Sequence, residues 1–505
     1  MSSSRLSPRH PQAAQTESAG ITRRHILSAA SAALATSSLS LTSFGAGAQQ
    51  TNATPPTGAG QPGRKLLLRG GMVLSMDSAV GDFPQGDVLI EGKQIVAVGP
   101  RIEAGDAAVV DATNRVVMPG FVDTHYHQYQ TALRSQLSDG LLANYMADMM
   151  GKLTPVFRPQ DVHIAVLLAS LDQIDGGVTT VVDTSQISHS PEHSDACIAA
   201  LKEVSRRALF AYSSGVGPNA KYPGDLQRLK SQYFASDDQL LSLALAVEFG
   251  GAAALNNYKL ARDDFKLARD MGTPLTSHVL GQFGADAAIR NFGEKNLLGP
   301  DNLLVHCTRL TDVGWKYIAD SGAKVSITPS IEMMMRHGMP PIQKAIDLGI
   351  RPALGSDIES TMIADFFHHM RAVLTLQRAF ANEQALNKEQ AVPTLLTPRD
   401  AIRMATLDGA RVAHLDHKVG SLTPGKEADI ILLRADAMNV APINNVPGAV
   451  VTLMDRSNVD TVLVAGKVLK WRGSMQNVDT ARILRDIDSS REYLLSKSGV
   501  TRKLF

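Results

Sequence analysis

The sequence predicts an α/β protein in which an eight-stranded parallel β/α barrel of the TIM type is joined to a small β-sandwich domain formed by both chain ends. Two observations predict this fold. Between residues 120 and 415, short apolar runs alternate with helical stretches, a pattern typical of a parallel sheet covered by helices. On either side, short β-type runs are broken by Gly and Asp turns, as expected of two half-domains that pair in space.

The N-terminal 48 residues have the pattern of an export signal. A basic pair, Arg23-Arg24, precedes an apolar stretch rich in Ala, Ser and Leu, which ends at the small residues Ala46-Gly47-Ala48. This order is typical of a bacterial twin-arginine signal peptide. We therefore expect the twin-arginine machinery to export the protein, cleavage to leave no membrane anchor, and the mature enzyme to be periplasmic or secreted. Residues 49–64, rich in Pro and Gly, are expected to form a linker.

The β domain is expected to comprise residues 65–119 and 416–472, followed by a helical tail over 473–505. The tail is polar and amphipathic, and we expect it on the outside of the protein or at a subunit contact. The strands predicted for the β domain are Lys65–Leu68, Val88–Ile90, Ile95–Val98, Val109–Val110, Ile430–Leu433, Val450–Leu453 and Val462–Val464.

The barrel is expected over residues 120–415, with chemistry at the carboxyl ends of its strands. Its last helix is predicted to begin at Pro398, because Thr397 and Asp400 form a capping box. The predicted strands are Val116–Val122, Val178–Val182, Ala208–Ala211, Leu243–Val247, Pro274–Thr276, Leu303–Val305, Val325–Ile327 and Ala353–Leu354.

Composition excludes several classes of protein. The 505 residues are 44% hydrophobic and 20% charged, with a net charge of +1, as in ordinary soluble globular proteins. No run of five Lys or Arg occurs and only 5% of residues are aromatic, which disfavours nucleic-acid binding and favours a small-molecule substrate. Two cysteines, Cys197 and Cys307, are too few for a disulfide framework.

A His-x-His pair marks the start of the barrel. His125 and His127 follow the apolar run Val116–Val122, and the two-residue period of a strand places both imidazoles on one face. Both can therefore reach one metal ion. The pair alone is weak evidence, but it ends the specific string MPGFVDTHYH at residues 118–127.

That string resembles the first barrel strand of the amidohydrolase superfamily, and further motifs agree in order over about residues 65–470. The similarity is greatest to the branch that contains cytosine, guanine and adenosylhomocysteine deaminases and triazine chlorohydrolases. The further motifs are GGVTTVVD at 176–183, DNLLVHCTRL at 301–310, ALGSD at 353–357, RMATLDGA at 403–410 and VGSLTPGKEAD at 419–429.

The resemblance implies a site for one divalent metal ion, with zinc expected before iron, cobalt or manganese. His125 and His127 are joined by His278, which matches the third imidazole ligand, and by Asp357, which matches the carboxylate that binds the metal and takes a proton from water. His306 matches a histidine that contacts water or substrate. Three imidazoles and a carboxylate with one open position are the ligands of a catalytic zinc site.

One position departs from the family pattern. Many deaminases of this branch carry Glu three residues after the third histidine ligand, where this chain has Gly281. Proton delivery must then come from another group, and Glu248 and Glu332 are the candidates. Glu248 is also a candidate bridge to a second metal or the partner of a nearby cation such as Lys259 or an arginine.

The segment that contains Glu332 is also a candidate for substrate contact. Glu332 and His337 are expected to touch the substrate. The run Met333–Met335 is expected to form a loop wall, core filling or an adaptable apolar pocket.

The resulting prediction is a metal-dependent hydrolase of a non-peptide C–N bond, such as an amide or cyclic amide, in a small organic molecule. Alternatives are deamination of a heterocycle and a metal-dependent lyase or decarboxylase reaction on the same site. An exported binding protein with a vestigial site is disfavoured, because every ligand position holds a competent residue. A homo-oligomer is expected from the resemblance.

Overall fold

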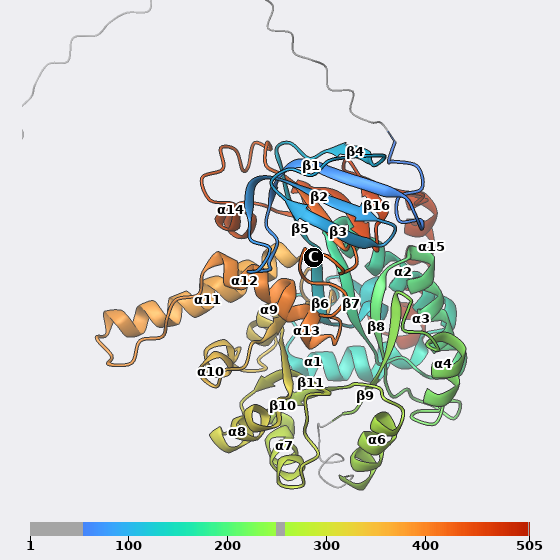
Figure 1. Ribbon diagram of the computed structural model, residues 1–505. Helices are drawn as coiled ribbons and strands as arrows, with labels where there is room; N and C mark the ends of the chain where they lie inside the picture. Colours follow the sequence, from blue (N-terminus) through green and yellow to red (C-terminus); the bar gives the residue numbers. More distant parts are fainter. Residues whose placement is uncertain (1–53, 249–257, 503, 505) are drawn as a thin grey trace, which may run out of the picture. The chain divides into compact units, whose positions relative to one another are not determined.

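The computed structural model describes residues 54–248, 258–502 and 504 (Figure 1). The predicted signal peptide, residues 1–48, and the beginning of the predicted linker lie outside the described residues. Within the described part of the chain, no helix combines the length and the apolar character that crossing a membrane requires.

Eight parallel strands form the barrel, in the order in which they follow along the chain. Every residue of β6, β7, β8 and β11 is buried, as expected of parallel strands covered on both faces. The predicted fold is therefore confirmed. The strands are β6 (Phe121–Tyr126), β7 (Val178–Ser185), β8 (Arg207–Tyr212), β9 (Leu241–Ala246), β10 (Leu275–Leu280), β11 (Asn302–Thr308), β12 (Lys324–Ile327) and β13 (Ala353–Leu354).

Helices connect the barrel strands. Two of them bear on the site: η2 (Tyr145–Leu153), in the long β6–β7 connection, and α9 (Pro329–Met334), which follows β12. The others are η1 (Gln128–Leu133), α1 (Leu142–Asn144), η3 (Thr154–Val156), α2 (Pro159–Asp175), α3 (Pro191–Val204), α4 (Leu226–Tyr233), α6 (Tyr258–Asp270), η4 (Gly281–Phe283), α7 (Ala285–Glu294), α8 (Asp312–Ser321), α10 (Ile342–Asp347), α11 (Phe366–Leu386), α12 (Pro398–Ala405) and α13 (Leu407–Val412).

The barrel closes at its predicted functional residues. Strand β13 has only two residues and meets β6 through one isolated bridge, between Tyr126 and Asp357. The backbone N–H of His127 donates to the carbonyl of Asp357 at 2.9 Å, and the N–H of Asp357 donates to the carbonyl of His125 at 2.9 Å. The first and last strands are thus joined where the predicted metal ligands lie.

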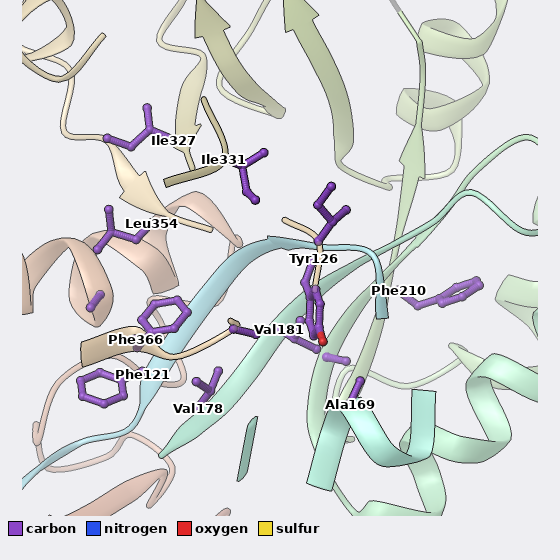
Figure 2. Close-up of a cluster of buried hydrophobic side chains, with 14 of the residues drawn as sticks. Phe121, Tyr126, Ala169, Val178, Val181, Phe210, Ile327, Ile331, Leu354 and Phe366 are labelled. Carbon is purple, nitrogen blue, oxygen red and sulfur yellow. The ribbon is translucent and has the colours of Figure 1, made fainter. Parts of the chain in front are cut away.

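Aromatic packing holds the start of β6 against α11. The Phe121 ring stacks on Phe366 with centroids 5.8 Å apart and meets Phe367 edge-on at 5.3 Å. Figure 2 shows Phe121 and Phe366 side by side, with Val178 and Val181 of the neighbouring strand close by. This buried cluster fixes the strand that carries the histidine pair.

The second sheet has nine strands drawn from both chain ends, as predicted for the small β domain. Strand β5 pairs antiparallel with β14, in a register that sets Pro119 opposite Ile430. Figure 1 shows β1 and β2, in blue, in the same sheet as β16, in red. The strands are β1 (Lys65–Val73), β2 (Phe83–Glu91), β3 (Gln94–Gly99), β4 (Ala108–Asp111), β5 (Arg115–Pro119), β14 (Ile430–Arg434), β15 (Val459–Val464), β16 (Lys467–Trp471) and β17 (Ser474–Met475).

Two predicted strands need correction. The run Val116–Val122 is divided at Gly120 into β5 of the sheet and β6 of the barrel. Gly120 packs closely on Thr179, since an added Cβ would lie 2.2 Å from that side chain. The predicted strand Val450–Leu453 is wrong. These residues lie in or just beyond helix α14 (Val446–Thr452), which begins where the Asn445 side chain accepts from the Gly448 N–H.

Two helix predictions are confirmed. Helix α12 begins at Pro398, and the Thr397 side chain accepts from the Asp400 N–H in a capping box. The tail forms α15 (Thr480–Ser498), which packs on α2. There the buried Ser490 hydroxyl donates to the Asp161 carboxylate at 2.8 Å.

Candidate metal centre and active site

Five predicted site residues meet at the carboxyl ends of the barrel strands. His125 lies in β6, with His127 one residue beyond its end, and His278 lies in β10. His306 lies in β11, and Asp357 follows β13. Parallel strands present their carboxyl ends on one face, so residues up to 232 positions apart form one cluster.

Ligand atoms within this cluster are spaced as a metal requires. The Nε2 atoms of His127 and His278 are 3.3 Å apart, and Asp357 Oδ1 lies 3.4 Å from His125 Nε2 and 3.7 Å from His127 Nε2. Ligands at about 2.0–2.1 Å from a tetrahedral zinc ion are about 3.4 Å from one another. The separations therefore fit one ion.

The far side of each imidazole is held in place. Thr184, at the end of β7, contacts both histidines of the pair: its hydroxyl lies 3.1 Å from His125 Nδ1, and its carbonyl accepts from His127 Nδ1 at 2.9 Å. His278 Nδ1 lies 3.2 Å from both carboxylate oxygens of Glu248. With Nδ1 engaged, the Nε2 atoms face the cluster, which is the orientation that metal ligation needs.

His125 carries the clearest sign of a ligand. Its side chain is fully buried, and its Nε2 has no hydrogen-bond partner. Buried polar atoms are normally paired, so this atom calls for a partner beyond the chain. Burial also lowers the pKa of His125 to about 4, which keeps the imidazole in the neutral form that binds metals.

Asp357 is ionised and held in a costly backbone conformation. Burial alone would raise the pKa of its carboxyl, but the nearby imidazoles of His125, His306 and His127 hold that pKa well below its usual range. Its φ is 69°, and His306 has a φ of 68°. Left-handed conformations at non-glycine residues cluster at functional sites, where surrounding contacts enforce them.

His306 faces the cluster and is supported from behind. Its Nε2 lies 3.7 Å from Asp357 Oδ2, and its Nδ1 lies 3.1 Å from the Thr328 hydroxyl and 3.2 Å from Glu332 Oε1. Glu332 is fully buried, burial raises its pKa to about 8, and its second oxygen has no partner. Glu332 is not among the residues that line the cavity; it lies behind His306.

Glu248 lines the cavity beside the predicted metal ligands. Besides contacting His278, it accepts from the Gln186 amide at 2.7 Å. Burial alone would raise the pKa of Glu248, but the charge of His278 and its hydrogen bond lower it to about 2. Its described partners are thus His278 and Gln186, whereas the side chain of Lys259, the cation suggested by the sequence, lies outside the described residues.

Gly281 leaves no room for the glutamate that the family resemblance would place there. An added Cβ would lie 2.3 Å from the carbonyl oxygen of Arg309 and 2.9 Å from that of Thr308. Both neighbours are backbone atoms, so a side chain would require the backbone to move. The missing glutamate is therefore a property of the fold at this point as well as of the sequence.

A cavity of about 380 Å³ opens on the cluster. Its lining includes His337, which is 4% exposed and has no hydrogen-bond partner on either ring nitrogen. Met335 also lines it, whereas Met333 and Met334 are exposed. Sequence reasoning missed the wall contributed by η2, namely Tyr145, Met146 and Met150, because those residues form an ordinary apolar helix pattern.

Comparison with known proteins gives a family match. Residues 116–469 match the model of the amidohydrolase family. A 5'-deoxyadenosine deaminase of Methanosarcina mazei is 24% identical over 86% of this chain and 99% of its own length. A 5-methylthioadenosine/S-adenosylhomocysteine deaminase of Desulfitobacterium hafniense is 27% identical over 84% of this chain and 97% of its own.

Solved structures share the fold. An adenosine deaminase from Xanthomonas campestris with bound zinc has a TM-score of 0.75 and 24% identity, covering 86% of this chain and 99% of that one. A mutant atrazine chlorohydrolase from Arthrobacter aurescens, complexed with zinc and atraton, has a TM-score of 0.75 and 21% identity, covering 84% and 100%. At these identities the likeness concerns the fold.

Proposed function

The chain belongs to the amidohydrolase family, and we propose that it hydrolyses a non-peptide C–N bond of a small organic molecule, such as an amide or cyclic amide, with one bound divalent ion, zinc. One observation carries the proposal: three imidazole nitrogens and one ionised carboxylate converge at the mouth of the barrel, beside a cavity. The zinc bound in two structures of the same fold supports the choice of metal.

The metal would be held by His125, His127, His278 and Asp357. Bound there, it would act as a Lewis acid that lowers the pKa of a water molecule and polarises the scissile group. Asp357, which is ionised and buried, accepts a proton from the attacking water. His306 faces the same space. It donates a hydrogen bond to the carbonyl oxygen of the amide and thereby polarises the carbon under attack.

Glu248 is our candidate for delivering a proton to the leaving group. It lines the cavity and lies two residues beyond the end of β9, close to the rigid strands of the barrel. Because the low pKa of Glu248 keeps it ionised, it must first accept the water proton, directly or from Asp357, and then pass it on. Glu332 is the second candidate, acting through His306 Nδ1.

Deamination of a heterocycle is the alternative that the comparisons favour, since both related sequences named above are deaminases. Against it stands Gly281, because an amine leaves poorly unless it is protonated. A lyase or decarboxylase reaction on the same residues would need no such acid.

The test is a panel of cyclic amides, anilides, carbamates and aminated heterocycles, assayed with zinc-loaded protein and with protein stripped by a chelator. We expect turnover of at least one amide, lost on stripping and restored by zinc. If the protein releases ammonia from the aminated heterocycles and hydrolyses no amide, deamination is its function. Turnover that survives complete removal of the metal would refute the proposal.

We also propose that the enzyme is exported by the twin-arginine route and works as a homo-oligomer outside the cytoplasm. Export is supported by the sequence around Arg23-Arg24 and the small residues at 46–48. Such export carries folded proteins, which suits an enzyme that acquires its metal before leaving the cytoplasm.

A further inference from the structure

The walls of the cavity are mainly apolar. The apolar wall of the cavity is formed by residues from the β6–β7 connection, namely Leu142, Tyr145, Met146 and Met150, and by Phe283 and Met335. Methionine side chains adapt to varied apolar shapes, and apolar walls bind by excluding water from apolar surface. This part of the site therefore suits the uncharged body of a substrate.

The charged side chains of the described lining are acidic. Glu248 and Asp357 are carboxylates, and no lysine or arginine occurs among the residues that the structure places on the cavity wall. The charge of a divalent ion would be balanced by these two carboxylates. A carboxylate or phosphate on the substrate would then lose its hydration without gaining a cationic partner, which is costly.

His337 is a buried polar residue of the cavity wall whose two ring nitrogens are both unpaired. It is 4% exposed, both its nitrogens lack partners, and its ring packs edge-on against His306 with centroids 4.9 Å apart. Leaving a buried donor and acceptor unpaired costs stability. A protein can retain such a destabilising residue when a bound ligand supplies the missing hydrogen bond.

We infer that the substrate is a neutral amide with an apolar body and no carboxylate or phosphate, and that a polar atom of it hydrogen bonds to the His337 imidazole. The inference rests on the proposed function for the nature of the reactive bond. His337 is then a residue that determines specificity, held by the segment that follows α9 next to the metal ligands.

Binding is tested with two matched pairs of probes: acetanilide against 4-acetamidobenzoate, and 2-pyrrolidinone against pyroglutamate. Each pair shares an amide and differs in a carboxylate. Dissociation constants are measured with zinc-loaded protein by calorimetry, before turnover is appreciable. We expect the neutral member to bind at least tenfold more tightly in both pairs. Equal or tighter binding of the carboxylates, or no binding of any probe, would overturn the inference.

A rim variant provides a second, independent arm. Met146 lines the cavity and is 45% exposed, so a lysine there is tolerated by the fold. Met146→Lys supplies the missing cation, and we expect it to improve binding of 4-acetamidobenzoate at least tenfold while weakening that of acetanilide. An unchanged preference in this variant would show that charge at the wall does not select the substrate.

The role of His337 is separated from a structural role by His337→Phe, which keeps a ring against His306 and removes both nitrogens. Because His337 makes no hydrogen bond within the protein, the melting temperature of the metal-free variant should equal or exceed that of the wild type. The dissociation constant of acetanilide should rise about tenfold. A lowered melting temperature with unchanged binding would assign His337 to the core instead.

His193→Phe is the matched control. His193 is as buried, at 8% exposure, but its nitrogens are paired with the Ser190 hydroxyl at 2.9 Å and the Phe157 carbonyl at 3.0 Å. The His193→Phe variant should lose stability and keep its affinity for acetanilide.

The same experiments separate this inference from the proposed function. If neutral probes bind as expected but none is hydrolysed, the inference stands and the proposed reaction fails. If amides are hydrolysed but anionic probes bind as tightly as neutral ones, the proposed reaction stands and the inference fails.

Discussion

At the scale of single residues, the histidines of the site fall into two groups. His125, His127 and His278 each have Nδ1 engaged by Thr184 or Glu248, which leaves Nε2 for a metal. His337 has neither nitrogen engaged. Second partners of this kind fix the tautomer and direction of a ligand, so these contacts distinguish the three predicted metal ligands from His337.

Asp357→Asn should abolish turnover, with a loss of about three orders of magnitude or more, and leave the fold intact. An amide neither accepts a proton nor balances the charge of the ion. The measurement is the turnover number on a substrate found by the panel, with circular dichroism and melting temperature as controls for folding. Near-normal activity would mean that Asp357 has been assigned wrongly.

Glu248→Gln should lower the turnover number by about two to four orders of magnitude, the usual contribution of general acid-base catalysis. The glutamine oxygen can still accept from His278, so the zinc content measured by atomic emission should stay at about one ion per chain. Glu332→Gln is the matched control. If activity survives in the Glu248 variant and fails in the Glu332 variant, proton delivery belongs to Glu332.

Asp264 makes the stability depend on pH. Burial, with a smaller contribution from the charge of Asp263, raises the pKa of Asp264 from 3.8 to about 6. Because the Tyr222 hydroxyl has one proton and lies 2.7 Å from the Ala246 carbonyl, it is poorly placed to donate to Asp264 as well, at 3.2 Å. Between about pH 4 and 6 the folded protein binds more protons than the unfolded chain, so stability falls as the pH rises through this window.

Asp264→Asn should therefore raise the melting temperature at pH 7.5, by roughly 1 to 3 °C, and by only about a third of that amount at pH 4.5. The comparison is made by calorimetry of both proteins at the two pH values. The neighbouring Asp263 has an exposed side chain, and Asp263→Asn should show a much smaller dependence on pH. An equal gain at both pH values would exclude the carboxyl charge as the cause.

At the scale of elements, the contact between β6 and β13 is narrow. Gly355 permits it, since an added Cβ would lie 2.9 Å from the Cβ of His125. The Tyr126 hydroxyl donates to Glu359 at 2.5 Å, and Arg134 donates to the same carboxylate at 2.9 Å. These hydrogen bonds join the segment around His125 and His127 to the segment that follows Asp357.

Tyr126→Phe should loosen this contact without touching a ligand. We expect release of zinc to a chelator to become about tenfold faster, in line with the effect of removing partners outside the ligand shell. Tyr129→Phe is the control: its hydroxyl contacts Gln130 at 3.0 Å rather than β13, so it should lose stability with little change in zinc release. Equal release rates in all three proteins would contradict a role for the β6–β13 contact.

At the scale of the whole molecule, the barrel and the nine-stranded sheet depend on each other. Arg207, at the start of β8, is almost fully buried and pairs with Asp429 at 2.9 Å and Glu427 at 2.6 Å. Both acids lie just before β14, which pairs with β5 of the other chain end. A buried charge is tolerated only when it is paired, so these contacts fix the barrel to the sheet.

The expected route of export gives a prediction for the full-length chain. Replacing the basic pair by lysines, Arg23→Lys together with Arg24→Lys, should keep the precursor inside a bacterial host that exports the wild type, because twin-arginine signals are read by their arginine pair. Fractionation and immunoblotting measure the periplasmic share. Undiminished export of the variant would mean that another signal directs the protein.

The sequence by itself determined the barrel, and the resemblance of its motifs to a known family indicated the predicted metal ligands. Parallel strands buried on both faces are mainly apolar, and side chains at the carboxyl ends of such strands lie at one end of the barrel. Thr397 and Asp400 likewise determined a helix start locally. These features depend on neighbours in the chain, which a sequence displays directly.

Only the tertiary structure decided the rest. Val450–Leu453 is a short apolar run that suits a strand or a helix equally, and burial against α11 and α12 made it part of α14. The pairing of His278 with Glu248, the burial of His337 without a hydrogen-bond partner, the wall from η2 and the absence of space at Gly281 all depend on residues distant in the sequence. Such contacts arise from the packing of separate elements, so no local pattern records them.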